Sequence, residues 1–132
     1  PLVNGDALKI PLRDSSLDGV TCGFALRNFR DINPFLKETA RILKPGARLA
    51  LLEVDEPKNS FLKIGHSFYF NKVVPFIGGL FSDKAAYGYL PRSVVYLPEE
   101  NELIKMIEYS GFKNVEKFRL TGGIAQLLIA EK

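Results

Sequence analysis

Residues 33–54 read NPFLKETARILKPGARLALLEV, and this stretch decides the predicted fold. In its first half the apolar side chains recur at helical spacing. Asn33-Pro34 supplies an N-cap and a first-turn proline, so we expect a helix over 33–43 that Pro45-Gly46 ends. In its second half, residues 48–54 are almost continuously apolar, which is typical of a strand buried on both faces of a parallel sheet. A helix leading into a buried strand, after an earlier strand, is a βαβ unit.

Further elements are predicted on both sides of this unit. Residues 19–25 are expected to form the earlier strand, since small residues alternate there with apolar ones. Later, a helix opened by Pro98-Glu99-Glu100 precedes two strands, 115–120 and 124–130, that a short turn joins. So short a turn makes the two strands antiparallel neighbours. The predicted fold is therefore α/β, with a mostly parallel sheet that ends in an antiparallel hairpin.

The composition is that of an ordinary globular domain, with 46% apolar and 25% charged residues. The formal net charge of +3 is small and the basic residues are dispersed, which argues against a nucleic-acid partner. The single cysteine, Cys22, is expected to be a small buried strand residue in a reducing cytosol. With one histidine, His66, no convincing set of metal ligands exists. Three basic side chains are expected to form only a solvated helix face: Lys37, Arg41 and Lys44.

Residues 57–97 differ from the rest because aromatic side chains crowd them. We expect one or two helices and a loop here, inserted between sheet elements. In open α/β sheets, ligands bind beyond the carboxyl ends of the strands, and an insertion after residue 54 leaves the sheet on that side. The insertion is expected to form a lid over a binding pocket or a groove for an apolar ligand, although ordinary packing would also explain its aromatics.

Several motifs together resemble one known family. The motifs are Gly5-Asp6-Ala7 with Ile10-Pro11-Leu12, Phe24 to Phe29 with Asp31, Arg41 to Gly46 with Leu52-Glu53, and Leu120 to Ile124. The first and third are similar to motifs of class I S-adenosylmethionine-dependent methyltransferases. The second and fourth resemble the UbiE-type C-methyltransferases of ubiquinone and menaquinone biosynthesis. The resemblance extends over essentially the whole chain and implies the carboxyl-terminal portion of a Rossmann-like sheet.

The chain also departs from the family pattern. The family begins with a strand, a Gly-rich turn and a helix that cradle the methyl donor, and none of these is present here. Residues 1–132 are therefore expected to be one partial domain, with strand 19–25 as an exposed sheet edge. We expect either a longer chain or a homodimer through that edge. Smaller departures are Gly23 and Asp55, where the family usually has serine, and Ala47, where it has glycine.

The resemblance implies methyl transfer from S-adenosylmethionine to a ring carbon of a prenylated quinol, with no metal ion. Arg27 is the predicted catalytic residue, because a fixed guanidinium can stabilise a developing quinolate oxygen, and Asn28 is expected to orient that oxygen or a water. An equally weighted alternative is that Arg27 is a loop residue paired with Asp31.

The donor and acceptor sites implied by the resemblance involve two further groups of residues. Asp6 is expected to accept a hydrogen bond from the adenine amine, with Ala7 alongside, although Asp6 could instead satisfy a local turn. Gly23 and Phe24 are expected to line the methionine end of the donor. Three tyrosines are expected to line the acceptor pocket, unless they only pack the inserted helices: Tyr69, Tyr87 and Tyr89.

The expected location is cytoplasmic, with loose docking at an anionic membrane as an addition. The lysines that flank the aromatic insertion suggest that docking: Lys58, Lys63 and Lys72. Two other functions remain open from the sequence. One is an inactive remnant that serves as a dimerising or binding module, and the other is a related methyltransferase with a different apolar acceptor.

Overall fold

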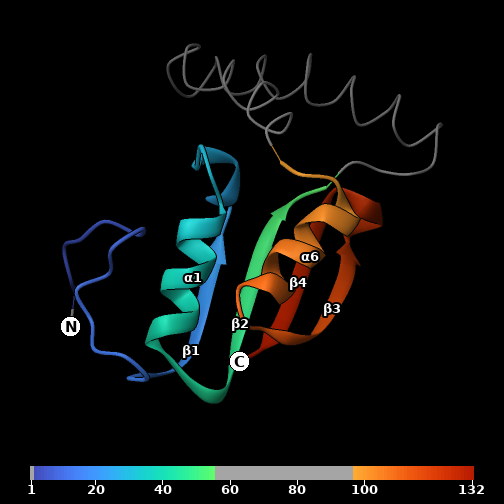
Figure 1. Cartoon of the computed structure of the whole chain (residues 1–132). Coiled ribbons are helices and arrows are strands. Elements are labelled where there is room, and N and C mark those ends of the chain that lie inside the picture. Colours follow the sequence, from blue (N-terminus) through green and yellow to red (C-terminus); the bar gives the residue numbers. More distant parts are fainter. Residues whose placement is uncertain (1, 56–96) are drawn as a thin grey trace, which may run out of the picture.

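The computed structural model describes residues 2–55 and 97–132, in which four strands form one sheet and two helices pack on one of its faces (Figure 1). The elements are β1 (Leu17–Gly23), the 3-10 turn η1 (Leu26–Asn28), α1 (Asn33–Ile42), β2 (Leu43–Val54), α6 (Glu100–Tyr109), β3 (Lys113–Leu120), the 3-10 turn η4 (Thr121–Gly123) and β4 (Ala125–Glu131). The predicted α/β class and the predicted order of these elements are confirmed.

The strand order is β1-β2-β4-β3. β1 and β2 are parallel, whereas β4 runs antiparallel to both β2 and β3, which confirms the carboxyl-terminal hairpin. β1, β2 and β3 therefore share one direction and only β4 reverses among the described strands. β1 lies at the end of this order, so the prediction that it forms a sheet edge is confirmed for the described residues.

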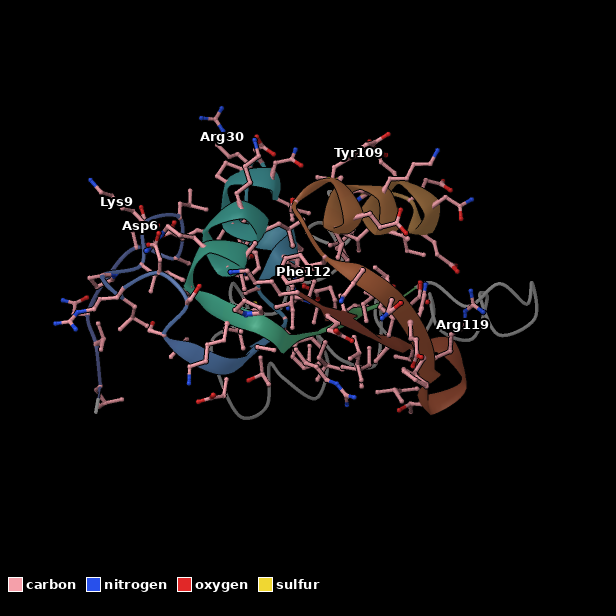
Figure 2. The ribbon with its side chains drawn as sticks, turned by 60° about the horizontal axis from the view of Figure 1, so that its bottom comes forward. Asp6, Lys9, Arg30, Tyr109, Phe112 and Arg119 are labelled. Atoms are coloured by element: carbon pink, nitrogen blue, oxygen red, sulfur yellow. The ribbon has the colours of Figure 1, made fainter. Side chains whose placement is uncertain are left out.

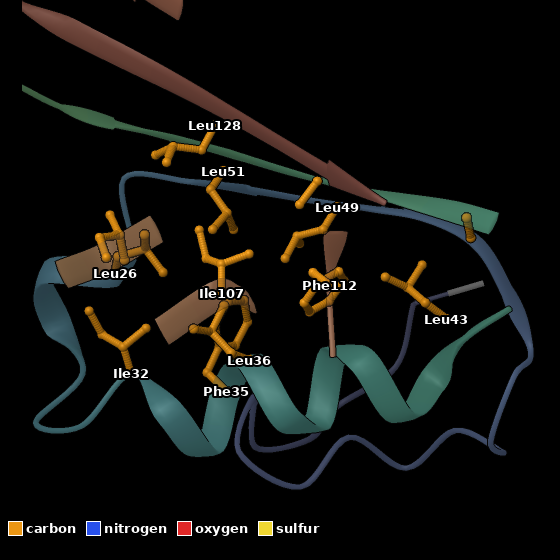
Figure 3. Packing of buried hydrophobic residues seen from close by; sticks show 13 residues of the cluster. Leu26, Ile32, Phe35, Leu36, Leu43, Leu49, Leu51, Ile107, Phe112 and Leu128 are labelled. Carbon is orange, nitrogen blue, oxygen red and sulfur yellow. The ribbon is translucent and has the colours of Figure 1, made fainter. Parts of the chain in front are cut away.

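The core lies between the sheet and the two helices (Figure 3). Successive side chains of a strand point to opposite faces. Leu49 and Leu51 of β2 therefore point to the helix side, beside Leu128 of β4. The helices contribute the opposing apolar residues, which are Phe35 and Leu36 from α1 and Leu103 and Ile107 from α6. Burial of this shared face holds the two helices on the same side of the sheet.

The opposite face of the sheet is also apolar. Leu52 of β2 lies across from Leu127 of β4, and both are half-buried. On β3, Phe118 and Leu120 are exposed. Neither described helix covers this face, although sheets of this kind are normally covered on both sides.

The boundaries of α1 and β2 correct two expectations. The N-cap position of α1 is occupied by Ile32 and not by Asn33. The capping side chain is that of Asp31, whose carboxylate accepts a hydrogen bond from the Asn33 N–H at 2.9 Å. The helix ends at Ile42, before Pro45-Gly46, and β2 begins immediately at Leu43. The residue before a proline is driven towards extended conformations, which explains why the chain is already extended there.

Arg41 is not a solvated residue of α1, contrary to expectation. Its guanidinium donates to the backbone carbonyls of Ile10 and Leu12, each at 2.9 Å. It also pairs with the carboxylates of Glu38 and Asp14. The same guanidinium holds the pKa of Glu38 below its ordinary value. Arg41 thereby fastens the N-terminal segment, residues 2–16, to α1.

A core substitution tests this packing. Replacing Leu51, whose exposed fraction is 1%, with alanine should lower the free energy of unfolding by about 2 to 5 kcal/mol in a urea titration, because it leaves a cavity between strands and helices. The control is Leu2→Ala at a fully exposed position, which should leave the midpoint unchanged. Equal midpoints for the two variants would contradict the core described here.

Candidate functional site

Several chain segments meet at the border of the sheet where β1, β2 and β3 end, which is a different border from the one formed by the outer strand β1. Because β1, β2 and β3 share a direction, their carboxyl ends meet there, and β4 begins at the same edge. This is where ligands bind in open α/β sheets. Of the predicted site residues, Gly23, Phe24, Arg27 and Asn28 all lie at this edge, in or just after the end of β1.

The chain turns sharply where β1 ends, two residues earlier than expected. Phe24 has a φ of +56°, in the left-handed region that is unfavourable for a bulky side chain. Its N–H still donates to the carbonyl of Leu52 at 2.8 Å, so the turn is tied to β2. The side chain of Leu26 is buried in the core and anchors η1. This anchored turn fixes the backbone position from which the Arg27 side chain extends.

Arg27 forms a buried ion pair with Glu53 near the end of β2. Arg27 Nη1 lies 3.0 Å from Glu53 Oε1, and the exposed fractions of the two side chains are 9% and 0%. Glu53 Oε1 also accepts from the Val54 N–H at 2.9 Å. The sequence-based alternative named Asp31 as the partner of Arg27, and that choice is wrong, because Asp31 instead caps the start of α1.

One of the buried donors of the guanidinium is unused in the described part of the chain. Arg27 Nε is buried and has no hydrogen-bond acceptor in the described part of the chain. A buried donor left in this state costs about 1 to 3 kcal/mol, which an incoming oxygen atom would recover. Arg27 Cζ also lies 5.8 Å from the centre of the Phe24 ring, within cation–π range. The arrangement is suited to receive an oxygen that carries, or develops, negative charge.

The end of β1 has room beside its backbone. An added Cβ at Gly23 would meet no atom within 4 Å, and its backbone does not have a positive φ. The ring of Phe24 is 45% exposed. Asn28 is exposed on the same 3-10 turn, where its N–H donates to the carbonyl of Ala25 at 2.9 Å. A ligand could therefore lie against the end of β1.

A second charged cluster occupies the β3 side of the same edge. Lys117, with an exposed fraction of 8%, has its Nζ 2.9 Å from Asp55 Oδ2 and 3.2 Å from Glu100 Oε2. Arg119 Nη2 lies 2.7 Å from the same Glu100 oxygen. The cluster joins the end of β2 to the first turn of α6. The positive and negative charges of its members balance. We therefore assign this cluster a structural role.

Asp6 and Ala7 belong to the N-terminal segment, and Asp6 lies to the left of the teal helix α1 in Figure 2. Asp6 Oδ1 accepts from the Leu8 N–H at 2.9 Å, and the Lys9 N–H donates to the Asp6 carbonyl at 3.0 Å. This is the local turn that the sequence left open as an alternative. Ala7 packs against the core.

Other predicted residues lie outside the described residues, namely Tyr69, Tyr87 and Tyr89, as well as His66 and the flanking lysines. Sequence reasoning missed the role of Glu53. The available signal was an acidic residue within the apolar run LALLEV, because a charge in a buried strand needs a partner. In residues 2–55 and 97–132 no group of three or more candidate metal ligands occurs.

Cys22 lies on β1, one strand away from Glu53. Its side chain is half-buried and packs against the core, as expected for a small strand residue. Burial, and secondly the negative charge of Glu53, raise the pKa of the Cys22 thiol above its ordinary value. The thiol therefore stays protonated at neutral pH.

The comparisons with known proteins agree on one family. A family model described as the ubiE/COQ5 methyltransferase family matches residues 1–132. A ubiquinone/menaquinone biosynthesis C-methyltransferase from Geotalea uraniireducens is 46% identical over 123 residues, covering 93% of this chain and 52% of that protein. A demethylmenaquinone methyltransferase from Staphylococcus carnosus is 41% identical over 132 residues, covering 99% of this chain and 55% of that protein. The chain thus spans about half the length of these curated relatives.

Solved structures support the fold. A SAM-dependent methyltransferase from Thermotoga maritima superposes with a TM-score of 0.62 at 22% identity, covering 98% of this chain and 63% of that chain. A second, from Aquifex aeolicus, gives a TM-score of 0.61 at 17% identity, covering 98% and 53%. Among the helices that the structure describes, none has the length and apolar character needed to cross a membrane.

The thiol of Cys22 provides a chemical test of this edge. Iodoacetamide should alkylate Cys22 several-fold more slowly at about pH 8 than a cysteine at the exposed neighbouring position, because only the thiolate reacts. The control is Thr21→Cys in a Cys22→Ala background, followed by mass spectrometry. Equal alkylation rates, or a faster rate at Cys22, would contradict the burial of this thiol.

Proposed function

This chain belongs to the ubiE/COQ5 methyltransferase family, and from that membership we propose that it forms the carboxyl-terminal portion of a methyltransferase acting on a prenylated quinol. The methyl donor in this proposal is S-adenosylmethionine and the acceptor atom is a ring carbon. The observation that carries the proposal is the buried guanidinium of Arg27, whose Nε–H has no acceptor in the described residues. The hydroxyl oxygen of a quinol is an acceptor of the required kind.

Methylation at carbon requires an electron-rich ring. Loss of the hydroxyl proton to water makes the neighbouring ring carbon nucleophilic, and the sulfonium donor supplies an activated methyl group when bound. Methyl transfer would break the S–CH3 bond and leave a neutral thioether, and the methylated carbon would then lose its hydrogen as a proton to water, which restores the aromatic ring. As negative charge develops on the oxygen, the Nε–H of Arg27 donates a hydrogen bond to it and the guanidinium stabilises the charge. Asn28, on the same turn, orients this oxygen or a water beside it.

The residues at the end of β1 fit a donor that lies beside the arginine. Gly23 leaves open space and Phe24 offers an exposed ring face, so the methionine end of the donor is placed along these two residues. Asp6 accepts from the adenine amine through its carboxylate, with the backbone of Ala7 alongside. Only one oxygen of Asp6 is needed for the local turn with Leu8.

The tyrosines at 69, 87 and 89 are proposed to line the acceptor pocket, within an insertion over 57–97 that acts as lid and tail groove. Loose docking of a cytoplasmic protein at an anionic membrane, through the lysines of the same insertion, is part of this proposal. These residues lie outside the described part of the chain, so the proposal rests on their aromatic and basic character.

Two structural features favour completion by further polypeptide. β1 is the edge strand of the described sheet, and the sheet face opposite the two helices carries half-buried or exposed apolar side chains. The curated relatives are about twice as long as this chain. We propose that the remaining part of the enzyme is supplied either by a longer polypeptide or by a second copy paired at the edge of β1.

An alternative function follows from the same length difference. A chain that lacks the donor-binding half would serve as an inactive binding or dimerising module. A further alternative is a methyltransferase with another apolar acceptor, such as a different phenol. The motif residues around Arg27 and Thr121 favour the quinol acceptor over this last one.

A fusion assay tests the proposed function. The fusion places one further segment upstream of residue 1, namely the part of the Geotalea uraniireducens relative that this chain does not match. In the presence of S-adenosylmethionine, this fusion should methylate a reduced short-chain naphthoquinol. The methylated product is detected by mass spectrometry. A reduced benzoquinol in parallel identifies the ring class. Calorimetric titration of S-adenosylhomocysteine into the unfused chain shows whether the chain builds a donor site alone. A folded fusion that methylates neither ring would reject the quinol proposal.

Arg27 itself is tested by a charge-preserving substitution. Arg27→Lys should lower kcat of the active fusion about 100-fold, because lysine keeps the charge but loses the Nε–H donor and the planar geometry. The matched control is Arg30→Lys, at an exposed position three residues away (Figure 2). Unchanged turnover in Arg27→Lys would remove Arg27 from the reaction and leave it a structural residue.

A further inference from the structure

We propose that Glu53 is the residue that positions Arg27. Its carboxylate fixes the guanidinium so that the Nε–H faces the acceptor oxygen, and it balances the positive charge of the guanidinium. This inference rests on the proposed function, since it assigns a role within the same reaction. Glu53 does not touch the acceptor in this proposal and acts only through Arg27.

Glu53 is well placed for this role because its own position is fixed. It lies in the central strand β2, its side chain is completely buried, and Oε1 accepts from the Val54 N–H at 2.9 Å. Arg27 then approaches this carboxylate in two ways from η1, the turn that follows the neighbouring strand β1. Its Nη1 lies 3.0 Å from Oε1, and its backbone N–H lies 3.5 Å from Oε2.

A second support acts on the other side of the guanidinium. The Phe24 ring lies 5.8 Å from Arg27 Cζ, and the turn at Phe24 is tied to β2 through Leu52. The carboxylate therefore holds one nitrogen of the guanidinium and the ring restrains the group as a whole. Among residues 2–55 and 97–132, no group accepts a hydrogen bond from Nε. A side chain held at two places with one donor unused is preorganised for a third contact.

The charge of Glu53 has a separate consequence. A buried arginine without its carboxylate would leave a full positive charge beside the acceptor hydroxyl, and that charge would favour the ionised quinol even at rest. With Glu53 present, the pair is neutral overall and the hydrogen bond strengthens only as the oxygen becomes negative. Removing the negative charge while keeping the hydrogen-bonding oxygen should therefore change the pH dependence of the reaction.

The alternative is that the pair merely fastens η1 to β2. Both roles predict a loss of stability when Glu53 is truncated, because a buried charge loses its partner. Both roles also predict a rigid Arg27 side chain, so a flexible Arg27 would overturn the positioning role, whereas a rigid one is required by both. Only the positioning role predicts that the pH profile moves when the charge of Glu53 is removed, and this readout decides between the roles.

The first experiment uses the 132-residue chain without substitutions. In a nitrogen-15 relaxation measurement on arginine side chains, the heteronuclear NOE of Arg27 Nε should match that of backbone amides in β2, whereas exposed Arg30 should show the low value of a freely moving side chain. Glu53→Ala should move the Arg27 value to that of Arg30. If Arg27 and Arg30 show the same low value in the unsubstituted chain, the positioning role is overturned.

The second experiment uses the active fusion described above. Glu53→Ala should lower kcat about 100-fold, the scale of a misplaced catalytic group, with the KM for the quinol changed far less. Glu53→Gln keeps an oxygen for Arg27 and Val54 but removes the charge, so the acidic limb of the kcat profile should move to lower pH. Glu131→Gln, which disrupts the exposed ion pair with Lys113 at the opposite edge of the sheet, is the matched control and should leave the profile unchanged.

Failure of this inference differs from failure of the proposed function. An inactive fusion with a rigid Arg27 would reject the quinol reaction and retain Glu53 as the residue that fixes Arg27. An active fusion whose pH profile is the same in Glu53→Gln and Glu131→Gln would retain the reaction and overturn the role of Glu53 in it. Circular dichroism of each variant identifies any that fails to fold, and a flexible Arg27 in the unsubstituted chain overturns the inference whatever the variants show.

Discussion

The described structure depends on the position of β2 between two neighbours. β2 donates and accepts backbone hydrogen bonds on both sides, to β1 in parallel and to β4 in antiparallel orientation. On the side that the helices cover, such a strand has little contact with water, so its side chains there must be apolar or paired. Leu49 and Leu51 meet this requirement by packing against the helices, and Glu53 meets it by pairing with Arg27. The core and the candidate site are thus two consequences of the same central strand.

The fold was largely predictable because its signals are local. An uninterrupted apolar run after a helix, and two strands separated by Thr121-Gly122-Gly123, specify the βαβ unit and the hairpin without knowledge of tertiary contacts. The boundaries were less predictable. Asp31 outcompetes Asn33 in satisfying the free N–H groups at the start of α1, and the proline at 45 extends the chain before the helix was expected to end. Both outcomes depend on backbone geometry that single residue types do not encode.

The site was predictable in part. The residues after β1 are brought together at the edge where the fold places ligands, as the sequence indicates. The partner of Arg27 could not be read from sequence spacing, because Asp31 is four residues away and Glu53 is twenty-six. Strand alternation, applied one step further, would have placed Glu53 on the helix side with Leu49 and Leu51. Arg41 was misjudged for a similar reason, since its acceptors are backbone carbonyls in a segment without regular structure.

The conformation of Phe24 has a consequence for attempts to stabilise this protein. Its left-handed backbone is one that glycine adopts without cost, so a method that optimises stability alone would replace phenylalanine by glycine here. This substitution would remove the phenylalanine ring that lies near Arg27. The guanidinium would then be free to rotate about its ion pair with Glu53. At this position, relief of the backbone strain at residue 24 and restraint of the Arg27 side chain require different residues. A thermostable variant selected without an activity screen would tend to lose the site first.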